Sequence, residues 1–369
     1  MKKLLKFVVV LLTICVVLVS ALLLYLHINE YKPEPTEEIL PKGDASGAVR
    51  EGDSLRLMTF NIGYGALDQS EDFFMDGGKT VNVKSRQKIL DNMQGIADIV
   101  YGSGTDVVFL QEVDRDSSRS HHVDEAEYLQ AAYPGCSMTY AANFRCDFIP
   151  YPIPPIGKVE GGLVTLNHLQ VGEAQRIALP VSFSWPVRLC QLKRCLLVQR
   201  VSVENSSREL VLVNLHLEAY DDGEGKEAQT RVLFDFLKEE YDKGNYVIAG
   251  GDFNQMFDEI GLEEYPLTDV SHFCPGSIDT TGLGAGWTFA NDPTVPTSRL
   301  LNEPYDPQSE NTQYYMLDGF ILSPNVTLEA VKTQDEGFAF ADHNPVTVKV
   351  TLQKMQDGRN QDEESADKR

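Results

Sequence analysis

An uncharged, apolar run near the N-terminus sets the strongest constraint on how this chain can fold. It extends from Phe7 to Leu26 and follows three lysines, Lys2, Lys3 and Lys6. About twenty such residues are enough to cross a bilayer as a helix. Lysines before the run favour a cytoplasmic N-terminus. We therefore predict one N-terminal transmembrane helix within residues 1–28, with the rest of the chain outside the cytoplasm.

A cleaved signal peptide is the alternative to a retained anchor. Signal peptides usually have a shorter apolar core, of about 7–15 residues, and end at a cleavage site with small residues. The stretch LVSALLLY offers only a poor site of that kind. The sequence favours a single-pass protein of the cell membrane with an extracytoplasmic domain, which cleavage would turn into a secreted protein.

Composition divides the remaining chain into three parts. Residues 29–53 hold prolines, charges and few core-forming residues, which predicts a linker. The tail, residues 354–369, has no apolar period and is predicted to be disordered. Residues 54–353 are enough for one large domain, which we expect to be monomeric.

Charge and cysteine content limit the classes of function. The formal net charge is −23, whereas a protein that grips nucleic acid normally carries a basic face, so stable nucleic-acid binding is not expected. Cys15 lies in the apolar run, and the other five cysteines leave at least one thiol unpaired. Cys190 with Cys195, or Cys136 with Cys146, could form a local disulfide.

Apolar strands alternate with a few helices along residues 54–353. Helical spacing occurs at 85–104 and 226–244, and residues 135–160 and 256–314 read as irregular. Several strands are near neighbours in sequence, which predicts an α/β domain of two mixed sheets packed face to face with helices outside. The predicted strands are 55–60, 106–114, 163–166, 195–203, 209–217, 245–254 and three after residue 315.

Polar side chains recur where these strands end. Alone, each is more simply a turn residue or a hydrogen-bonded core histidine. Together they indicate a site, because apolar strands do not acquire buried carboxylates without partners. Oxygen-rich clusters suit Mg²⁺ or Mn²⁺ rather than zinc. The residues are Asn61, Glu112, His216, Asp252, Asn254, Asp318, Asp342 and His343.

The stretch IAGGDFNQ, residues 248–255, shows the pattern most clearly. Strand alternation predicts that Asp252 and Asn254 face one side and Phe253 plugs the core on the other. Gly250 and Gly251 are predicted to let the backbone bend or approach a phosphate.

Six short motifs carry a resemblance to a known family. They occur in the order of the endonuclease/exonuclease/phosphatase superfamily, the DNase-I-like metal-dependent phosphoesterases. The resemblance implies a four-layer α/β/β/α sandwich and hydrolysis of a phosphate ester. The motifs are TFNIG (59–63), LQEV (110–113), NLHLE (214–218), GGDFN (250–254), LDGFILS (317–323) and ADHNPV (341–346).

The resemblance also implies a role for each strand-end residue. The metal ligands would be Asn61, Glu112, Asp252 and Asp342. The catalytic residues would be His216 on the phosphate, Asp252 and Asn254 at the attacking water, and His343 oriented by Asp318. Members differ on which group is the base and which is the acid.

The substrate is not specified by these motifs. His168 stands where family members often carry a Ser-Arg or Ser-Lys pair, so one substrate contact is not carried over. Two segments supply aromatic residues that either touch a lipid or base or pack as core: Phe144, Phe148, Tyr151, Phe183 and Trp185.

We predict a Mg²⁺- or Mn²⁺-dependent phosphoesterase that uses in-line water attack, acting on a lipid head group or small phosphate ester. An exported nuclease and a non-catalytic binding domain are the alternatives.

Overall fold

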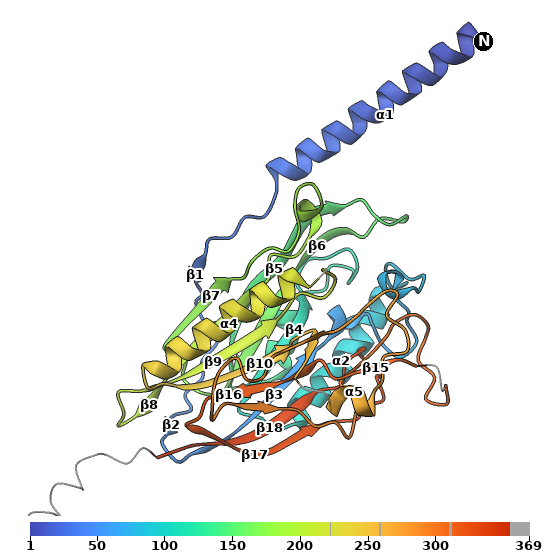
Figure 1. Cartoon of the computed structure of the whole chain (residues 1–369). Coiled ribbons are helices and arrows are strands. Elements are labelled where there is room, and N and C mark those ends of the chain that lie inside the picture. Colours follow the sequence, from blue (N-terminus) through green and yellow to red (C-terminus); the bar gives the residue numbers. More distant parts are fainter. Residues whose placement is uncertain (222, 258–259, 310–311, 355–369) are drawn as a thin grey trace, which may run out of the picture.

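The computed structural model describes residues 1–221, 223–257, 260–309 and 312–354 (Figure 1). Within them, a long N-terminal helix leads into one α/β body. The tail predicted to be disordered, residues 354–369, lies outside the described residues except for Lys354.

Helix α1 (Lys2–Ile28) projects away from the rest of the molecule (Figure 1). Its apolar side chains are mostly exposed, and Leu26 is its one buried residue. Among the described residues it is the one helix long and apolar enough to cross a membrane. The structure thus confirms an apolar N-terminal helix that could span a bilayer.

The larger sheet contains eight strands among the described residues. Its order is β1-β7-β8-β9-β10-β16-β13, and β2 pairs with β8. Strands β9 and β10 run parallel, whereas β10 and β16 run antiparallel, so the sheet is mixed. The bounds are β1 (Thr36–Glu38), β2 (Val49–Arg50), β7 (Glu173–Ala178), β8 (Cys195–Glu204), β9 (Glu209–His216), β10 (Tyr246–Asp252), β13 (Thr288–Ala290) and β16 (Asp318–Leu322).

The smaller sheet contains six strands in the described part of the chain, in the order β17-β18-β3-β4-β6-β5. It is also mixed, because β3 and β4 are parallel and the other pairs antiparallel. The bounds are β3 (Ser54–Asn61), β4 (Val107–Asp114), β5 (Ser137–Ile149), β6 (Gly157–Asn167), β17 (Val326–Thr333) and β18 (Val346–Leu352).

Helices, 3₁₀ turns and two small strand pairs make up the other regular elements of the described chain. The helices besides α1 are α2 (Arg86–Gly102), α3 (Glu125–Ala132), α4 (Glu224–Asp242) and α5 (Ile260–Glu264), with 3₁₀ turns η1 (Gly63–Gly65), η2 (Phe74–Asp76) and η3 (Val187–Cys190). Two small pairs are β11 (Gln255–Met256) with β12 (Gly276–Ser277), and β14 (Ser298–Arg299) with β15 (Tyr314–Tyr315).

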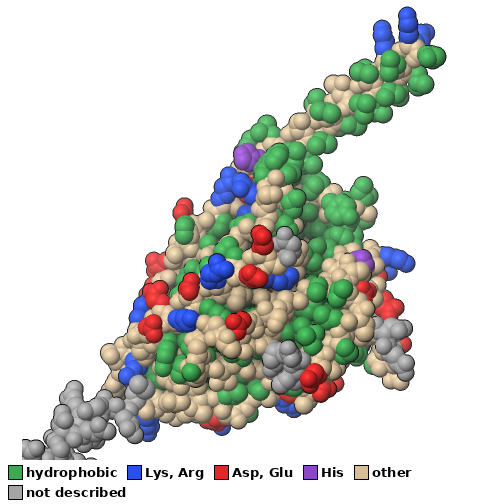
Figure 2. All heavy atoms as spheres, in the orientation of Figure 1, with side chains coloured by type: hydrophobic (Ala, Val, Ile, Leu, Met, Phe, Trp, Pro, Cys, Tyr) green, Lys and Arg blue, Asp and Glu red, His purple; other side chains and the backbone are tan. Residues whose placement is uncertain are grey.

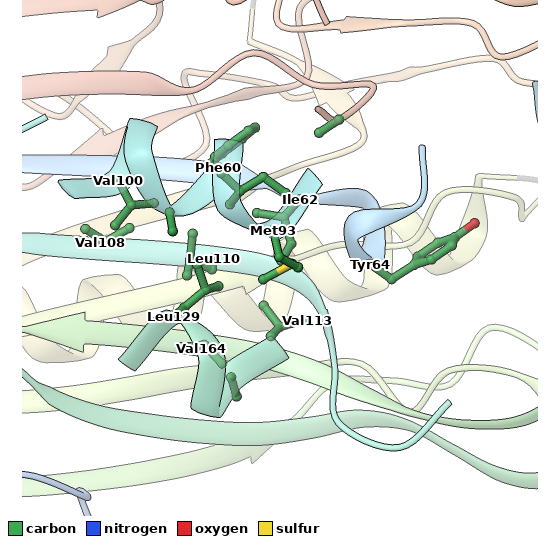
Figure 3. Close-up of a cluster of buried hydrophobic side chains, with 14 of the residues drawn as sticks. Phe60, Ile62, Tyr64, Met93, Val100, Val108, Leu110, Val113, Leu129 and Val164 are labelled. Carbon is green, nitrogen blue, oxygen red and sulfur yellow. The ribbon is translucent and has the colours of Figure 1, made fainter. Parts of the chain in front are cut away.

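The apolar faces of these elements make three packed interfaces. Between the two sheets, Phe109 of the smaller sheet packs with Phe320 of the larger one at 6.2 Å between ring centroids. Outside the smaller sheet, Met93 of α2 lies among side chains of β3 and β4 (Figure 3). Outside the larger sheet, Leu233 of α4 packs on Val213. The predicted four-layer sandwich is confirmed.

Residues 135–160, predicted to be irregular, and residues 29–53, predicted to be a linker, differ from these predictions. Residues 135–160 were predicted to be irregular, which is wrong, since β5 and β6 form a long hairpin and only its tip carries the proline cluster. Bulges between Ala142 and Phe144 interrupt the alternation that would have revealed a strand. Within residues 29–53, β1 and β2 add to the larger sheet, so this segment lies along the domain.

The cysteines also meet differently from the two expected pairs. All six are free thiols. The two sulfur atoms that approach each other belong to Cys146 of β5 and Cys190 of η3, with Sγ atoms 3.7 Å apart. Neither of the two pairings that the sequence left possible is formed, and the approach of Cys146 to Cys190 arises because the fold brings η3 onto the hairpin.

A buried ion pair joins α4 to the larger sheet and yields a stability prediction. The Glu240 side chain, 1% exposed, accepts two hydrogen bonds of 2.8 Å from Arg200 and further ones from Lys243 and Asn245. Burial opposes its ionisation, but these donors hold the pKa of Glu240 at about 2, below its usual value of 4.5. The stabilisation is therefore present above about pH 4.5 and is lost as the pH falls towards 2.

We expect Glu240→Gln to lower the free energy of unfolding by about 2–3 kcal/mol at pH 7, measured by denaturant unfolding of the full chain in detergent. The difference from wild type should shrink as the pH falls below 4.5. Glu239→Gln, at an exposed neighbouring position, is the control and should change stability by less than about 0.5 kcal/mol. A Glu240→Gln effect independent of pH would contradict this account.

Candidate active site

The strand ends of both sheets meet at one place. In the larger sheet, Asp252 at the end of β10 is opposite His216 of β9 on one side and Asp318 of β16 on the other. In the smaller sheet, Asn61 ends β3 and Glu112 lies near the end of β4. The structure brings together all eight residues singled out from the sequence.

Asn61 links the two sheets within this site. Its Nδ2 donates to Asp252 Oδ2 at 3.0 Å and to Glu112 Oε1 at 3.2 Å. Its Oδ1 accepts from the Gly63 backbone N–H at 3.1 Å. The amide thus holds two carboxylates from different sheets side by side.

Glu112 reaches the site through an irregularity in β4. Its φ of +54° lies in the left-handed region, which costs a non-glycine residue about 1–2 kcal/mol. The pairing with β6 shifts register between Leu110 and Val113. The bulge lets Gln111 point between the sheets, where it donates to Asn214 at 2.8 Å, while Glu112 lines the cavity beside Asp252.

Asn254 is placed by a turn rather than by strand alternation. Strand β10 ends at Asp252, and Asn254 has a φ of +51°. Its backbone N–H donates to Asp252 Oδ1 at 2.9 Å, and its Nδ2 donates to the Leu217 carbonyl at 2.9 Å. The prediction for Phe253 is confirmed, because this side chain is fully buried against Phe257.

Gly250 and Gly251 serve sheet packing. A Cβ on Gly250 would lie 2.5 Å from the Phe320 ring, and one on Gly251 would lie 1.9 Å from the Leu215 carbonyl oxygen. The neighbours that require glycine here are therefore core atoms. These contacts explain both glycines by close packing within the sheet and do not indicate the predicted approach of the backbone to a phosphate.

Asp318 and His343 form a hydrogen-bonded pair beside Asp252. His343 Nδ1 lies 2.8 Å from Asp318 Oδ2, so its Nε2 faces Ser298 Oγ at 3.2 Å and Asp252 Oδ2 at 3.8 Å. Burial alone would lower the pKa of His343, but the surrounding carboxylates outweigh it and raise the pKa well above 6.5. The surrounding carboxylates therefore favour the protonated form of this ring.

The pKa of the second histidine is shifted in the opposite direction. Burial lowers the pKa of His216 well below 6.5, and the cations of Arg194 and His343 add to the shift. Its Nε2 lies 3.5 Å from Asp252 Oδ2, and its Nδ1 is buried without a hydrogen-bond partner among the described residues. The two imidazoles beside this carboxylate thus differ in which protonation state their surroundings favour.

Crowded carboxylates fit a divalent cation. Burial raises the pKa of Asp252 to about 6, with a further rise from Asp318. Burial likewise raises the pKa of Asp342 to about 7, with a further rise from Glu112. Asp342 Oδ1 and Asp318 Oδ1 are buried without partners. A cation would relieve both the repulsion and the unmet hydrogen bonding.

Two overlapping groups could hold that cation. Asp252, Asp318 and His343 offer three ligand atoms within 4.8 Å of one another. In this group, however, Asp318 and His343 already bind each other. The oxygen atoms of Glu112, Asp252 and Asp342 are the better match for a hard ion.

The structure adds three arginines that sequence reasoning missed as site residues. Arg119, Arg194 and Arg299 line the same cavity as the strand-end cluster. Arg119 stacks on the Tyr64 ring at 3.7 Å and donates twice to Asp114 at 2.9 Å. Only Arg194 lay in a basic stretch visible in the sequence; nothing around Arg119 or Arg299 in the sequence indicated that the fold would turn them inward.

Two packed mixed sheets between helices, with carboxylates and histidines meeting where the strands end, define a DNase-I-like sandwich. A family model described as the endonuclease/exonuclease/phosphatase family matches residues 58–343. The chain belongs to that family, whose members are metal-dependent phosphoesterases.

Solved structures share the same fold. An endonuclease/exonuclease/phosphatase from Beutenbergia cavernae is 20% identical with a TM-score of 0.56, covering 81% of this chain and 72% of that one. D. rerio TDP2 complexed with single-strand DNA product is 17% identical with a TM-score of 0.50, covering 81% and 99%. A Bacteroides thetaiotaomicron family protein is 16% identical with a TM-score of 0.51, covering 83% and 100%. A comparison with curated protein sequences gives no match.

Proposed function

We propose that this chain is a membrane-anchored, divalent-metal-dependent phosphoesterase with its catalytic domain outside the cytoplasm. It hydrolyses a phosphodiester or phosphomonoester of a lipid head group or another small molecule. In this proposal residues 1–28 form the anchor, 29–53 the linker and 54–353 the catalytic domain. The observation that carries it is the convergence of Asn61, His216 and His343 on the buried Asp252 carboxylate, at 3.0, 3.5 and 3.8 Å.

The metal ligands in this proposal are Asn61, Glu112, Asp252 and Asp342, and the ion is Mg²⁺ or Mn²⁺. When bound, such an ion neutralises a non-bridging phosphate oxygen and activates water. Asn61 keeps Glu112 and Asp252 together through its two hydrogen bonds. The unpartnered Asp342 Oδ1 supports its place in the set.

The other residues bind and orient the phosphate ester. Asp252 and His343 are the two groups that can exchange a proton with the attacking water and the leaving oxygen, and Asp318 fixes the His343 ring through Nδ1. Asn254 fixes the Asp252 carboxylate through its backbone N–H. His216 donates to a phosphate oxygen through a ring N–H. Water then attacks phosphorus in line with the P–O bond that breaks.

Net charge favours a small ester over nucleic acid. At −23 the chain would repel a long polyanion, so its affinity for DNA should be low at physiological salt. TDP2, which was solved with a DNA product, shares only the fold at this level of identity.

A panel of esters tests the proposed function. The full-length protein in detergent is assayed on p-nitrophenyl phosphate, bis-p-nitrophenyl phosphate and plasmid DNA, each with Mg²⁺ and with EDTA. We expect Mg²⁺-dependent release of p-nitrophenol from at least one ester and little nicking of plasmid. Release that EDTA does not affect, or no hydrolysis of any ester, would show the proposal to be wrong.

A further inference from the structure

A single cavity connects the strand-end cluster to the base of helix α1. It encloses about 610 Å³. At one end it is lined by the polar side chains of Asp252, Asp342 and His343. Next to the base of α1 the lining is largely apolar, formed by residues such as Leu23, Leu26, Phe144, Ile149, Ile156 and Val187, and the Arg119 guanidinium also lies 5.8 Å from the Phe144 ring centroid. A pocket of this size would hold most of a drug-sized ligand, and its lining combines the polar groups of the strand-end cluster with apolar groups at the base of α1.

Helix α1 is fixed against the apolar end of the cavity. Leu26 is buried among Ile149 of β5 and Leu189 of η3, and Leu22 and Leu23 pack on the same cluster. Tyr25 Oη donates to Asp147 at 3.2 Å. The last turn of the proposed membrane helix is therefore part of the cavity wall.

Ion pairs just after the helix strengthen this attachment. The Glu30 side chain is 3% exposed and lies 3.3 Å from Arg188 Nε and 3.6 Å from Lys193 Nζ. Arg188 belongs to η3, and two other residues of this turn, Val187 and Cys190, line the cavity. The geometry between the helix and the cavity mouth is thus set by buried contacts and not by a free linker.

Two segments that contribute to the cavity lining also expose large apolar side chains. At the tip of the β5–β6 hairpin, Tyr151 lines the cavity and is 70% exposed, and Ile153 nearby in sequence is 94% exposed. In and just before η3, Val187 lines the cavity and is 52% exposed, and Trp185 is 53% exposed. Figure 2 shows hydrophobic side chains gathered on the surface around the base of α1. Such a patch is costly in water and typical of a surface that meets lipid, with Trp and Tyr at the interface.

We propose that the substrate of this site is a membrane lipid whose hydrocarbon chain occupies the apolar end of the cavity while its phosphate reaches Asp252 and His343. This inference rests on the proposed function and names its substrate class. The helix brings the cavity mouth to the bilayer surface, so the lipid enters from the membrane. Water adds to phosphorus, one P–O ester bond breaks, and the released alcohol oxygen takes up the proton.

A chain-length series tests the inference on the full-length protein in detergent. The probes are p-nitrophenyl ethyl, butyl and octyl phosphate, each used below its critical micelle concentration with Mg²⁺. Burial of each methylene changes the rate by up to roughly fourfold. We expect kcat/KM to rise at least about 100-fold from the ethyl to the octyl ester.

Two surface variants test whether the dependence of kcat/KM on chain length arises in the cavity. Tyr151→Asn and Val187→Asn place a polar group on the apolar wall at exposed positions where folding tolerates it. Each should reduce the octyl-to-ethyl ratio of kcat/KM about tenfold or more. Tyr101→Asn, at an exposed position of α2 that does not line the cavity, is the control and should leave the ratio unchanged.

The outcomes separate this inference from the proposed function. Equal kcat/KM for ethyl and octyl esters would overturn the lipid assignment and leave the phosphoesterase in place. Faster cleavage of single-stranded DNA than of the octyl ester would also overturn it. No hydrolysis of any ester with Mg²⁺ would overturn both.

Discussion

Asp252→Asn is expected to lower kcat/KM on any ester that this protein hydrolyses by about 10³-fold. The carboxylate is 1% exposed and is the one group in contact distance of Asn61, His216 and His343 within the described site. An amide of the same shape keeps an oxygen for the Asn254 N–H but removes the negative charge. Loss of one such charged group in a buried site usually costs between 10² and 10⁴ in rate.

The same variant should remain folded. Repulsion between Asp252 and the neighbouring Asp318 disfavours the folded state when no cation is bound, so removal of one charge relieves it. Thermal unfolding in EDTA should therefore show a midpoint equal to or above that of wild type. Asp235→Asn, on an exposed position of α4, is the matched control for both measurements. Activity within tenfold of wild type would remove Asp252 from the mechanism.

Chelation of divalent metal is expected to abolish hydrolysis completely. Glu112, Asp252 and Asp342 all line the same cavity, where Glu112 repels Asp342 and Asp318 repels Asp252. Without a cation this negative charge should disfavour binding of an anionic phosphate ester. Dialysis against EDTA should therefore remove activity, and titration with Mg²⁺ or Mn²⁺ should restore it.

The variant Glu112→Gln tests whether Glu112 is one of the metal ligands. The change removes one charged ligand but keeps an acceptor for Asn61. We expect the half-saturating Mg²⁺ concentration to rise at least about tenfold, with a smaller change in the maximal rate at saturating Mg²⁺. Glu127→Gln, on partly exposed α3, should leave the metal titration unchanged. Full activity in EDTA would contradict a metal mechanism.

The order of strands and helices could be predicted because each element carries its own pattern. Strand β4 is a continuous apolar run, and α4 shows apolar residues at helical spacing, so the layers followed from local signals. The strand-end residues could be predicted for a related reason: a charge after an apolar strand stands out in the sequence. Sheet packing then brings such ends together.

Features that depend on contacts between distant segments could not be predicted. Strand β5 was missed because its bulges break the alternation of buried and exposed side chains. The turn at Asn254 and the left-handed Glu112 have no local signature beyond the residues themselves. Arg119 became a neighbour of the site only because β4 and the following loop bring it over the Tyr64 ring. These are properties of tertiary structure, and one sequence does not encode them locally.

The hydrogen bond from Asn61 to Asp252 joins the two sheets across their shared interior. Each sheet contributes only some of the side chains of the site: Asn61 comes from the smaller sheet and Asp252 from the larger one. A slight slide of one sheet over the other would pull the pair apart while leaving every strand intact. We therefore expect substitutions deep between the sheets, such as at Phe109 or Phe320, to change turnover without contacting the site. In the proposed mechanism the alignment of the two layers is itself a determinant of rate.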